Sequence, residues 1–145
     1  TQSVVEELSA QAEKKKLKLL WKKPSAPMWV RADEGKLRQV IMNLIDNALK
    51  YTDQGHVEVS LVKKDGAAQF AARDTGIGIT KEGLSNLFQK FVRGANASHY
   101  HADGSGIGLY VAKKMMEEHK GEVWAESEGE GKGSAFFVKM GEWRE

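Results

Sequence analysis

The segment from Glu34 to about Tyr51 has the residue spacing of a long amphipathic helix, and Asp33 before it is a natural N-cap. Its apolar residues recur at intervals of three and four, which is the pattern of a helix face that packs on a core. Such a helix favours a layered fold, in which another element covers the apolar face. The apolar positions are Leu37, Val40, Ile41, Leu44, Ile45 and Ala48.

Segments with strand-like alternation supply the other layer. Val57, Val59 and Leu61 alternate with polar residues, and Asp65-Gly66 predicts a tight hairpin. The order of helices and strands predicts an α/β two-layer sandwich, with a mixed, mainly antiparallel sheet and helices on one face. The expected strands are 17–21, 28–32, 56–61, 67–73, 122–127 and 134–140, and the expected helices are 3–16, 34–51, 81–91 and 107–119.

Length and composition fit one ordinary domain. The chain has 145 residues, of which 41% are hydrophobic and 29% charged, and it has no cysteine, which excludes a disulfide framework and a thiolate nucleophile. The net charge of +2 is too small to indicate a nucleic-acid partner. No apolar run approaches the ~20 residues that cross a bilayer. We therefore expect a soluble, cytoplasmic domain, which is also compatible with one part of a membrane-anchored protein.

Three polar residues of the long helix share one narrow face. Offsets of four and seven residues place Asn43, Asn47 and Lys50 together, beside the apolar face. Two amide oxygens can ligate Mg²⁺, and a lysine one turn on can contact a phosphate as a point charge. For this helix taken alone, a solvated polar face is the simpler interpretation.

Two glycine-bearing segments follow. Asp74-Thr75-Gly76-Ile77-Gly78 comes after the second hairpin strand, where a carboxylate can accept a hydrogen bond from an exocyclic amine and glycines let a flat ligand approach. Gly104 to Leu109 leads into a helix, whose N-terminal amides favour an anion such as phosphate. The second segment lacks the spacing of a dinucleotide-binding fingerprint, and Gly131 to Ser134 does not fit a P-loop.

Four motifs together resemble those of one family. Residues 43–51 resemble the N box of histidine kinases, 74–78 their first glycine box, 88–91 their F box and 104–109 their second glycine box. They occur in the family's order and at its spacing, over roughly residues 18–145. The chain thus resembles the ATP-binding catalytic domain of sensor histidine kinases, within the GHKL ATPase superfamily. Residues 1–17 are then expected to form a helical tail from an absent dimerisation domain.

The resemblance implies a role for each matching residue. Asn47, with help from Asn43, would ligate Mg²⁺, while Lys50 and Arg93 would contact the phosphates of ATP. Tyr51 would lie along the nucleotide. The other nucleotide-binding positions that the resemblance implies are Asp74, which would accept a hydrogen bond from the adenine amine, and Gly76, Gly78, Ile79, Gly104, Ser105, Gly106, Ile107, Gly108 and Leu109.

The resemblance also implies a mobile segment over the nucleotide. Residues 93–103 are polar and glycine-bearing, which suits the family's ATP lid, and Phe88 and Phe91 would anchor that lid on the core.

One position decides between branches of the superfamily. Relatives of the gyrase, chaperone and anti-sigma-factor kinase types have a glutamate where this chain has Asn43. An amide has no useful basicity, so Asn43 cannot activate water as a general base. A histidine kinase needs no base there, because a neutral imidazole nitrogen is already a nucleophile.

The phosphoacceptor of such a kinase is not expected in this chain. None of His56, His99, His101 and His119 stands in the pattern His-Glu-x-x-x-Pro. The predicted function is therefore binding of MgATP and transfer of its γ-phosphoryl group to a histidine on the absent dimerisation domain. The alternative is a degenerate nucleotide-binding module that docks onto partners without phosphotransfer. Expected partners are that dimerisation domain and, downstream, a response regulator; the isolated domain should be a monomer and the whole kinase a homodimer.

Overall fold

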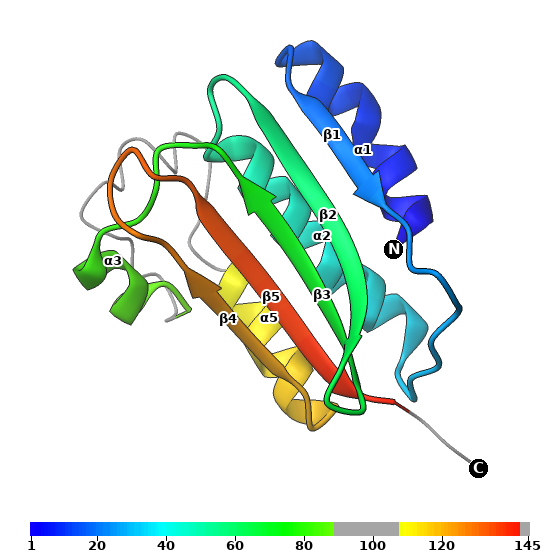
Figure 1. Ribbon diagram of the computed structural model, residues 1–145. Coiled ribbons are helices and arrows are strands. Elements are labelled where there is room, and N and C mark those ends of the chain that lie inside the picture. Colours follow the sequence, from blue (N-terminus) through cyan, green and yellow to red (C-terminus); the bar gives the residue numbers. More distant parts are fainter. Residues whose placement is uncertain (89–107, 143–145) are drawn as a thin grey trace.

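The computed structural model describes residues 1–88 and 108–142. In this part of the chain a five-stranded sheet carries helices on one face, as Figure 1 shows. The predicted two-layer sandwich is therefore confirmed. The elements are α1 (Gln2–Lys14), β1 (Lys18–Lys22), α2 (Glu34–Lys50), β2 (His56–Lys64), β3 (Ala67–Asp74), α3 (Lys81–Asn86), α5 (Gly108–Glu118), β4 (Glu122–Glu126) and β5 (Ser134–Gly141).

The sheet is mixed and mainly antiparallel. Its strand order is β1-β2-β3-β5-β4, in which β1 pairs with β2 in parallel and all other pairs are antiparallel. The helix α2 connects the two parallel strands, since a parallel pair needs a long crossover between its strands. In the ladder between β3 and β5, Asp74 lies directly opposite Ser134. This register joins the end of β3 to the start of β5.

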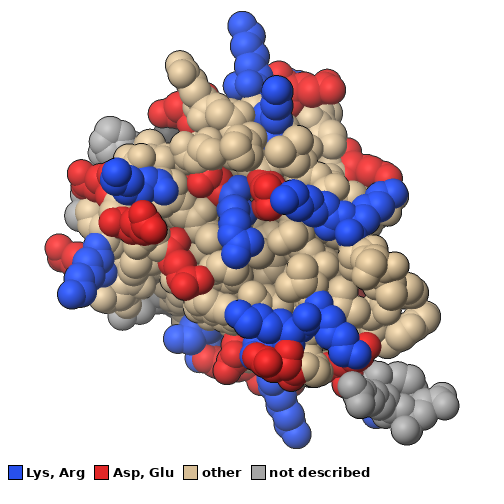
Figure 2. Space-filling model, in the orientation of Figure 1, with Lys and Arg blue, Asp and Glu red and all other residues tan. Residues whose placement is uncertain are grey.

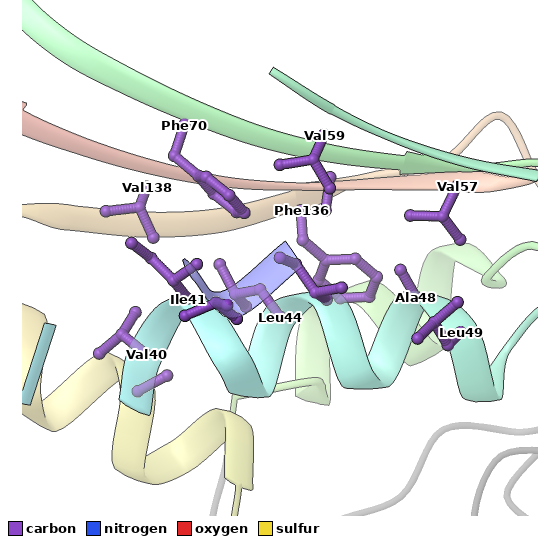
Figure 3. Packing of buried hydrophobic residues seen from close by; sticks show 14 of the residues in the cluster. Val40, Ile41, Leu44, Ala48, Leu49, Val57, Val59, Phe70, Phe136 and Val138 are labelled. Carbon is purple, nitrogen blue, oxygen red and sulfur yellow. The ribbon is translucent and has the colours of Figure 1, made fainter. Parts of the chain in front are cut away.

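The core lies between α2 and the sheet. Leu44 and Ile45 of α2 are fully buried, and the side chains of Val59 and Phe136 meet the helix from the sheet, as Figure 3 shows. Asp33 begins the helix as predicted, because its carboxylate accepts a hydrogen bond from the Lys36 amide at 3.0 Å. Core packing and capping together fix α2 in place beneath the strands.

The N-terminal helix α1 packs into the same core. Val4, Val5, Leu8 and Ala12 form its buried face. Polar contacts join α1 to α2, among them the bond from Arg38 to the Ser3 hydroxyl at 2.6 Å. The division of the chain at residue 17 stays a prediction, while α1 shares one hydrophobic core with the elements after it.

The expected strand at 28–32 is wrong. The segment between β1 and α2 forms no ladder with the sheet. It does keep strand-like alternation, since Met28, Val30 and Ala32 are partly buried while Trp29 and Arg31 are exposed. Inward packing of alternate side chains therefore produces the pattern here without a paired strand.

The face of the sheet away from the helices carries mixed charge. Figure 2 shows basic and acidic side chains interspersed over it, with no broad field of one sign. This distribution matches the small net charge of +2. Among the described residues, no helix has the length and apolar character needed to span a bilayer.

Candidate functional site

Asp74 is a buried carboxylate that three donors hold in place. Its side chain is only 7% exposed and has the same strand parity as buried Phe70 and Ala72, so it points toward the helix layer. Oδ1 accepts hydrogen bonds from the Gly76 amide at 2.9 Å and the Ser134 amide at 3.2 Å, and Oδ2 accepts from the Ser134 hydroxyl at 2.6 Å. The carboxylate is therefore a fixed acceptor at the end of β3.

Burial raises the pKa of Asp74 above its ordinary value of 3.8. The hydrogen bonds from Ser134 and Gly76 favour the charged form and act in the opposite direction, so they offset part of the effect of burial. A carboxylate kept in such surroundings destabilises the fold relative to a neutral group of the same shape. A side chain with that cost is a candidate for function.

The segment after Asp74 packs directly on the C-terminal end of α2. The Ile77 amide donates to the Tyr51 carbonyl at 3.0 Å. A Cβ atom on Gly76 would lie 2.1 Å from the same carbonyl oxygen, so only glycine fits there. The sequence suggested that glycine is present here to admit a ligand. The structure gives a further reason for a glycine, because the backbone at Gly76 closely approaches the backbone at Tyr51.

Gly78 and the turn before β5 close the other side of this segment. Gly78 has φ +75°, and a Cβ atom there would lie 2.0 Å from the carbonyl oxygen of Gly129. The Gly131 amide donates to the Ile77 carbonyl at 2.7 Å, and the Gly133 amide donates to the Gly76 carbonyl at 3.2 Å. Residues 74–79 are thus held between α2 and the glycine-rich turn.

The polar face of α2 adjoins the start of α5. The side-chain amide nitrogen of Asn43 donates to the Gly108 carbonyl at 3.2 Å. Since that nitrogen is occupied, the amide group of Asn43 keeps a defined orientation, and its oxygen is the atom that can act as a ligand. The structure therefore brings Gly108, the last glycine of the second glycine box, beside the N box.

Asn47 and Lys50 continue this face toward the end of α2. Asn47 lies one turn after Asn43 and is partly buried. The ammonium of Lys50 lies 3.1 Å from Oδ2 of Asp46, a pair in which both side chains are about one third exposed. Lys50 is therefore already held near the polar face by a carboxylate.

Several predicted positions lie in the core. Tyr51 is 1% exposed and its ring packs against Phe136 with centroids 5.7 Å apart. Ile79 is fully buried, its amide donating to the Ser127 hydroxyl at 3.0 Å, and Leu109 is 6% exposed in α5. The contact of these side chains with a nucleotide stays a prediction.

The remaining predicted positions lie outside the described residues. They are Arg93, Gly104, Ser105, Gly106, Ile107, His99, His101, the 93–103 segment and the F-box residues after Phe88. Phe88 itself is partly buried against the core, and its role as a lid anchor stays a prediction. In the described ranges no three or more His, Asp or Glu side chains gather as a metal site. The side chains of α2 that could still offer oxygen ligands on this face are the amides of Asn43 and Asn47 and the carboxylate of Asp46.

Sequence reasoning missed Ser134 and Asp46. Ser134 donates twice to Asp74, but it is 60 residues away, and only the register of β3 with β5 brings the two together. Asp46 lies within the N box and was given no role from the sequence alone. Its spacing of four residues from Lys50 is nevertheless the spacing of an ion pair on a helix. That spacing was the one signal available in the sequence.

Comparison with known proteins places the chain in a family. Residues 32–143 match the family described as "Histidine kinase-, DNA gyrase B-, and HSP90-like ATPase", and the chain belongs to it. Sensor histidine kinase WalK of Bacillus subtilis is 36% identical over 120 residues, which cover 81% of this chain and 20% of WalK. Adaptive-response sensory kinase SasA of Synechococcus elongatus is 36% identical over 141 residues, or 96% of this chain and 36% of SasA.

A solved structure gives the same assignment. The crystal structure of full-length ShkA in complex with AMPPNP superposes on this chain with a TM-score of 0.85 and 28% sequence identity. The match covers 99% of this chain and 29% of ShkA. The chain thus spans only about a third or less of these relatives. The resemblance to the ATP-binding domains of sensor histidine kinases is confirmed.

We expect Asp74→Asn to keep the fold and to change its pH dependence. The asparagine oxygen can accept from both backbone amides, and its nitrogen can donate to the Ser134 hydroxyl. Because the folded-state pKa of Asp74 is raised, its contribution to stability is full below pH 3.8 and is lost as pH rises through the folded value. The melting temperature of the variant relative to the parent should therefore be higher at pH 7 than at pH 4.

Melting curves of both proteins across that range measure the difference. A difference that stays constant with pH would show that burial of the Asp74 charge has no energetic consequence.

Proposed function

We propose that this domain binds MgATP and transfers the γ-phosphoryl group to a histidine on the dimerisation domain of the same kinase. The observation that carries the proposal is the buried, oriented carboxylate of Asp74 at the end of β3, close to the C-terminal end of α2. It supplies a fixed hydrogen-bond acceptor for the adenine base of a nucleotide. The polar face of α2 supplies amide groups and an ammonium group near which the phosphates would lie.

Asp74 would accept a hydrogen bond from the adenine amine. Oδ2 takes one bond from the Ser134 hydroxyl, and a carboxylate oxygen has a second lone pair for another donor. Because Gly76 and Ser134 already fix the carboxylate, little ordering is needed when the base arrives. Gly76 and Gly78 keep the backbone close and leave no side chain beside the acceptor.

Asn43, Asn47 and Lys50 would face the phosphates. The oriented amide of Asn43 and the amide of Asn47 one turn on fit a hard cation that also binds phosphate oxygens and water. Mg²⁺ bound there would neutralise phosphate charge. Lys50 would contact the terminal phosphates from the same face, and Tyr51, Ile79 and Leu109 would form the apolar wall behind the nucleotide.

The residues outside the described ranges complete the proposal. Arg93 would add a cation to the phosphates. The amides of Gly104, Ser105, Gly106, Ile107 and Gly108 would donate to phosphate oxygens at the start of α5, with the positive end of that helix toward the anion.

The protein's contribution to transfer would be positioning and charge neutralisation. Phosphoryl transfer needs an in-line nucleophile and stabilised oxygens, with little covalent chemistry from the enzyme. Asn43 cannot act as a base toward water, which supports a histidine as acceptor and slow hydrolysis. A neutral imidazole nitrogen attacks without prior proton removal.

The acceptor domain and downstream partner belong to the same proposal. The relatives that cover most of this chain are named sensor kinases and are several times its length. We infer a cytoplasmic catalytic domain with residues 1–17 as the transition from a dimerisation domain, a homodimeric whole kinase, and a response regulator as the next acceptor.

The function is tested by mixing this chain with a separate histidine-bearing dimerisation domain and γ-labelled ATP. Acid-labile, base-stable label should appear on the added histidine domain and not on this chain alone. Tight ATP binding without label on any cognate domain would instead support an interaction module that lacks phosphotransfer.

We predict that Asn47→Ala weakens ATP binding in the presence of Mg²⁺ and abolishes transfer. Two neutral amides give little affinity for the free ion, so the ion would enter with ATP. ADP binding without Mg²⁺ should change much less, because the contact at Asp74 does not involve the ion. Calorimetric titrations with and without Mg²⁺, together with a melting curve, make the comparison.

If Asn47 only packs the helix, the variant should melt earlier and bind every nucleotide worse to the same degree. Equal losses with and without the metal would remove Asn47 from the ligand set.

A further inference from the structure

One carboxylate on α2 joins two side chains from different helices. Oδ1 of Asp46 accepts a hydrogen bond from Nε2 of Gln11 in α1 at 2.8 Å, and Oδ2 of the same group lies 3.1 Å from the ammonium of Lys50. The three residues thus form a continuous polar chain from α1 to the candidate phosphate-binding lysine. Gln11 and Asp46 are 35 residues apart, so the tertiary packing of α1 on α2 creates the link.

Gln11 is attached to a fixed element. The neighbouring Ala12 is 2% exposed and Leu8, one turn earlier, is 7% exposed, so core packing holds this part of α1 in place. A second contact fixes the same end of α2, because the ammonium of Lys15 donates to the Leu49 carbonyl at 2.6 Å. The C-terminal end of α2, which bears Lys50, is therefore held at two points, by Gln11 of α1 and by Lys15 at the C-cap of that helix.

These contacts restrict the motion of the Lys50 side chain and still allow its ammonium to bind phosphate oxygens. A lysine has a flexible four-carbon stem, and ordering it costs free energy when a ligand binds. The ion pair with Asp46 is a single contact to an ammonium that has three N–H donors, so donors remain for phosphate oxygens. Because Gln11 fixes one oxygen of Asp46, the other oxygen presents a stationary partner to Lys50.

We propose that Gln11 is a positioning residue that acts through Asp46 to hold Lys50 in place for the phosphates of ATP. This inference rests on the proposed function, since it assigns Lys50 to the phosphates. If Asp46 instead competed with phosphate for Lys50, removal of Gln11 would relieve that competition and tighten ATP binding. The two differ in sign, so binding measurements separate them.

The test uses Gln11→Leu, which removes the donor and changes no charge. Titration calorimetry with ATP and with AMP compares a nucleotide that reaches Lys50 with one that lacks the terminal phosphates. We expect the dissociation constant for ATP to rise about three- to tenfold, the size of a modest coupling between neighbouring groups. The dissociation constant for AMP should stay within about twofold of its value in the unaltered chain.

Ser3→Ala is the matched control. It also removes an uncharged donor or acceptor between α1 and α2, the bond from Arg38 at 2.6 Å, but at the other end of the helix pair. It should leave both dissociation constants unchanged. Gln11→Asn shortens the side chain by one methylene and should give the same loss as Gln11→Leu, which keeps the test available if the leucine variant folds poorly.

A double-mutant cycle with Lys50→Met isolates the coupling. The effect of Gln11→Leu on ATP should disappear in that background, because there is no ammonium left to position. The inference is overturned if Gln11→Leu tightens ATP binding, weakens ATP and AMP equally, or keeps its full effect without Lys50. Failure of the proposed function looks different: the unaltered chain would not bind ATP, or Lys50→Met alone would leave ATP affinity unchanged.

Discussion

The buried carboxylate of Asp74 is the interaction on which the arrangement of this end of the molecule depends. A charge that is only 7% exposed is stable only where donors surround it, and here the donors come from Gly76 and Ser134. To supply them, β3 and β5 must pair in the observed register and the chain must turn sharply after Asp74. Gly133, whose Cβ would lie 2.3 Å from the Asp74 carbonyl oxygen, permits that close approach.

The helix α2 serves both the core and the candidate site. Its apolar face meets the sheet (Figure 3), while the face with Asn43, Asn47 and Lys50 is bordered by α5 on one side and α1 on the other. These contacts therefore hold the side chains of Asn43 and Lys50 without any ligand. A site that uses groups already held by the core loses little conformational entropy on binding, which suits a reaction that depends on positioning.

Local sequence patterns predicted most of the helices and strands, but they could not predict contacts between residues far apart in the sequence. The periodicity of α2, the Asp33 cap and the Asp65-Gly66 hairpin act within a few residues, and each was confirmed. The alternation at 28–32 was misleading because a segment can bury alternate side chains without pairing. The donors to Asp74 and the link from Gln11 to Asp46 join distant residues, and no spacing along one sequence encodes such pairs.

The central claim is that Asp74 recognises the amine of adenine, and ATP compared with ITP tests it most directly. The two nucleotides share ribose and phosphates, but ITP has a carbonyl oxygen where adenine has its amine. That oxygen would face the carboxylate, so ITP should bind roughly ten- to a hundredfold more weakly, as expected for loss of a charge-assisted hydrogen bond. Equal dissociation constants for ATP and ITP, measured by calorimetry with Mg²⁺, would contradict the claim.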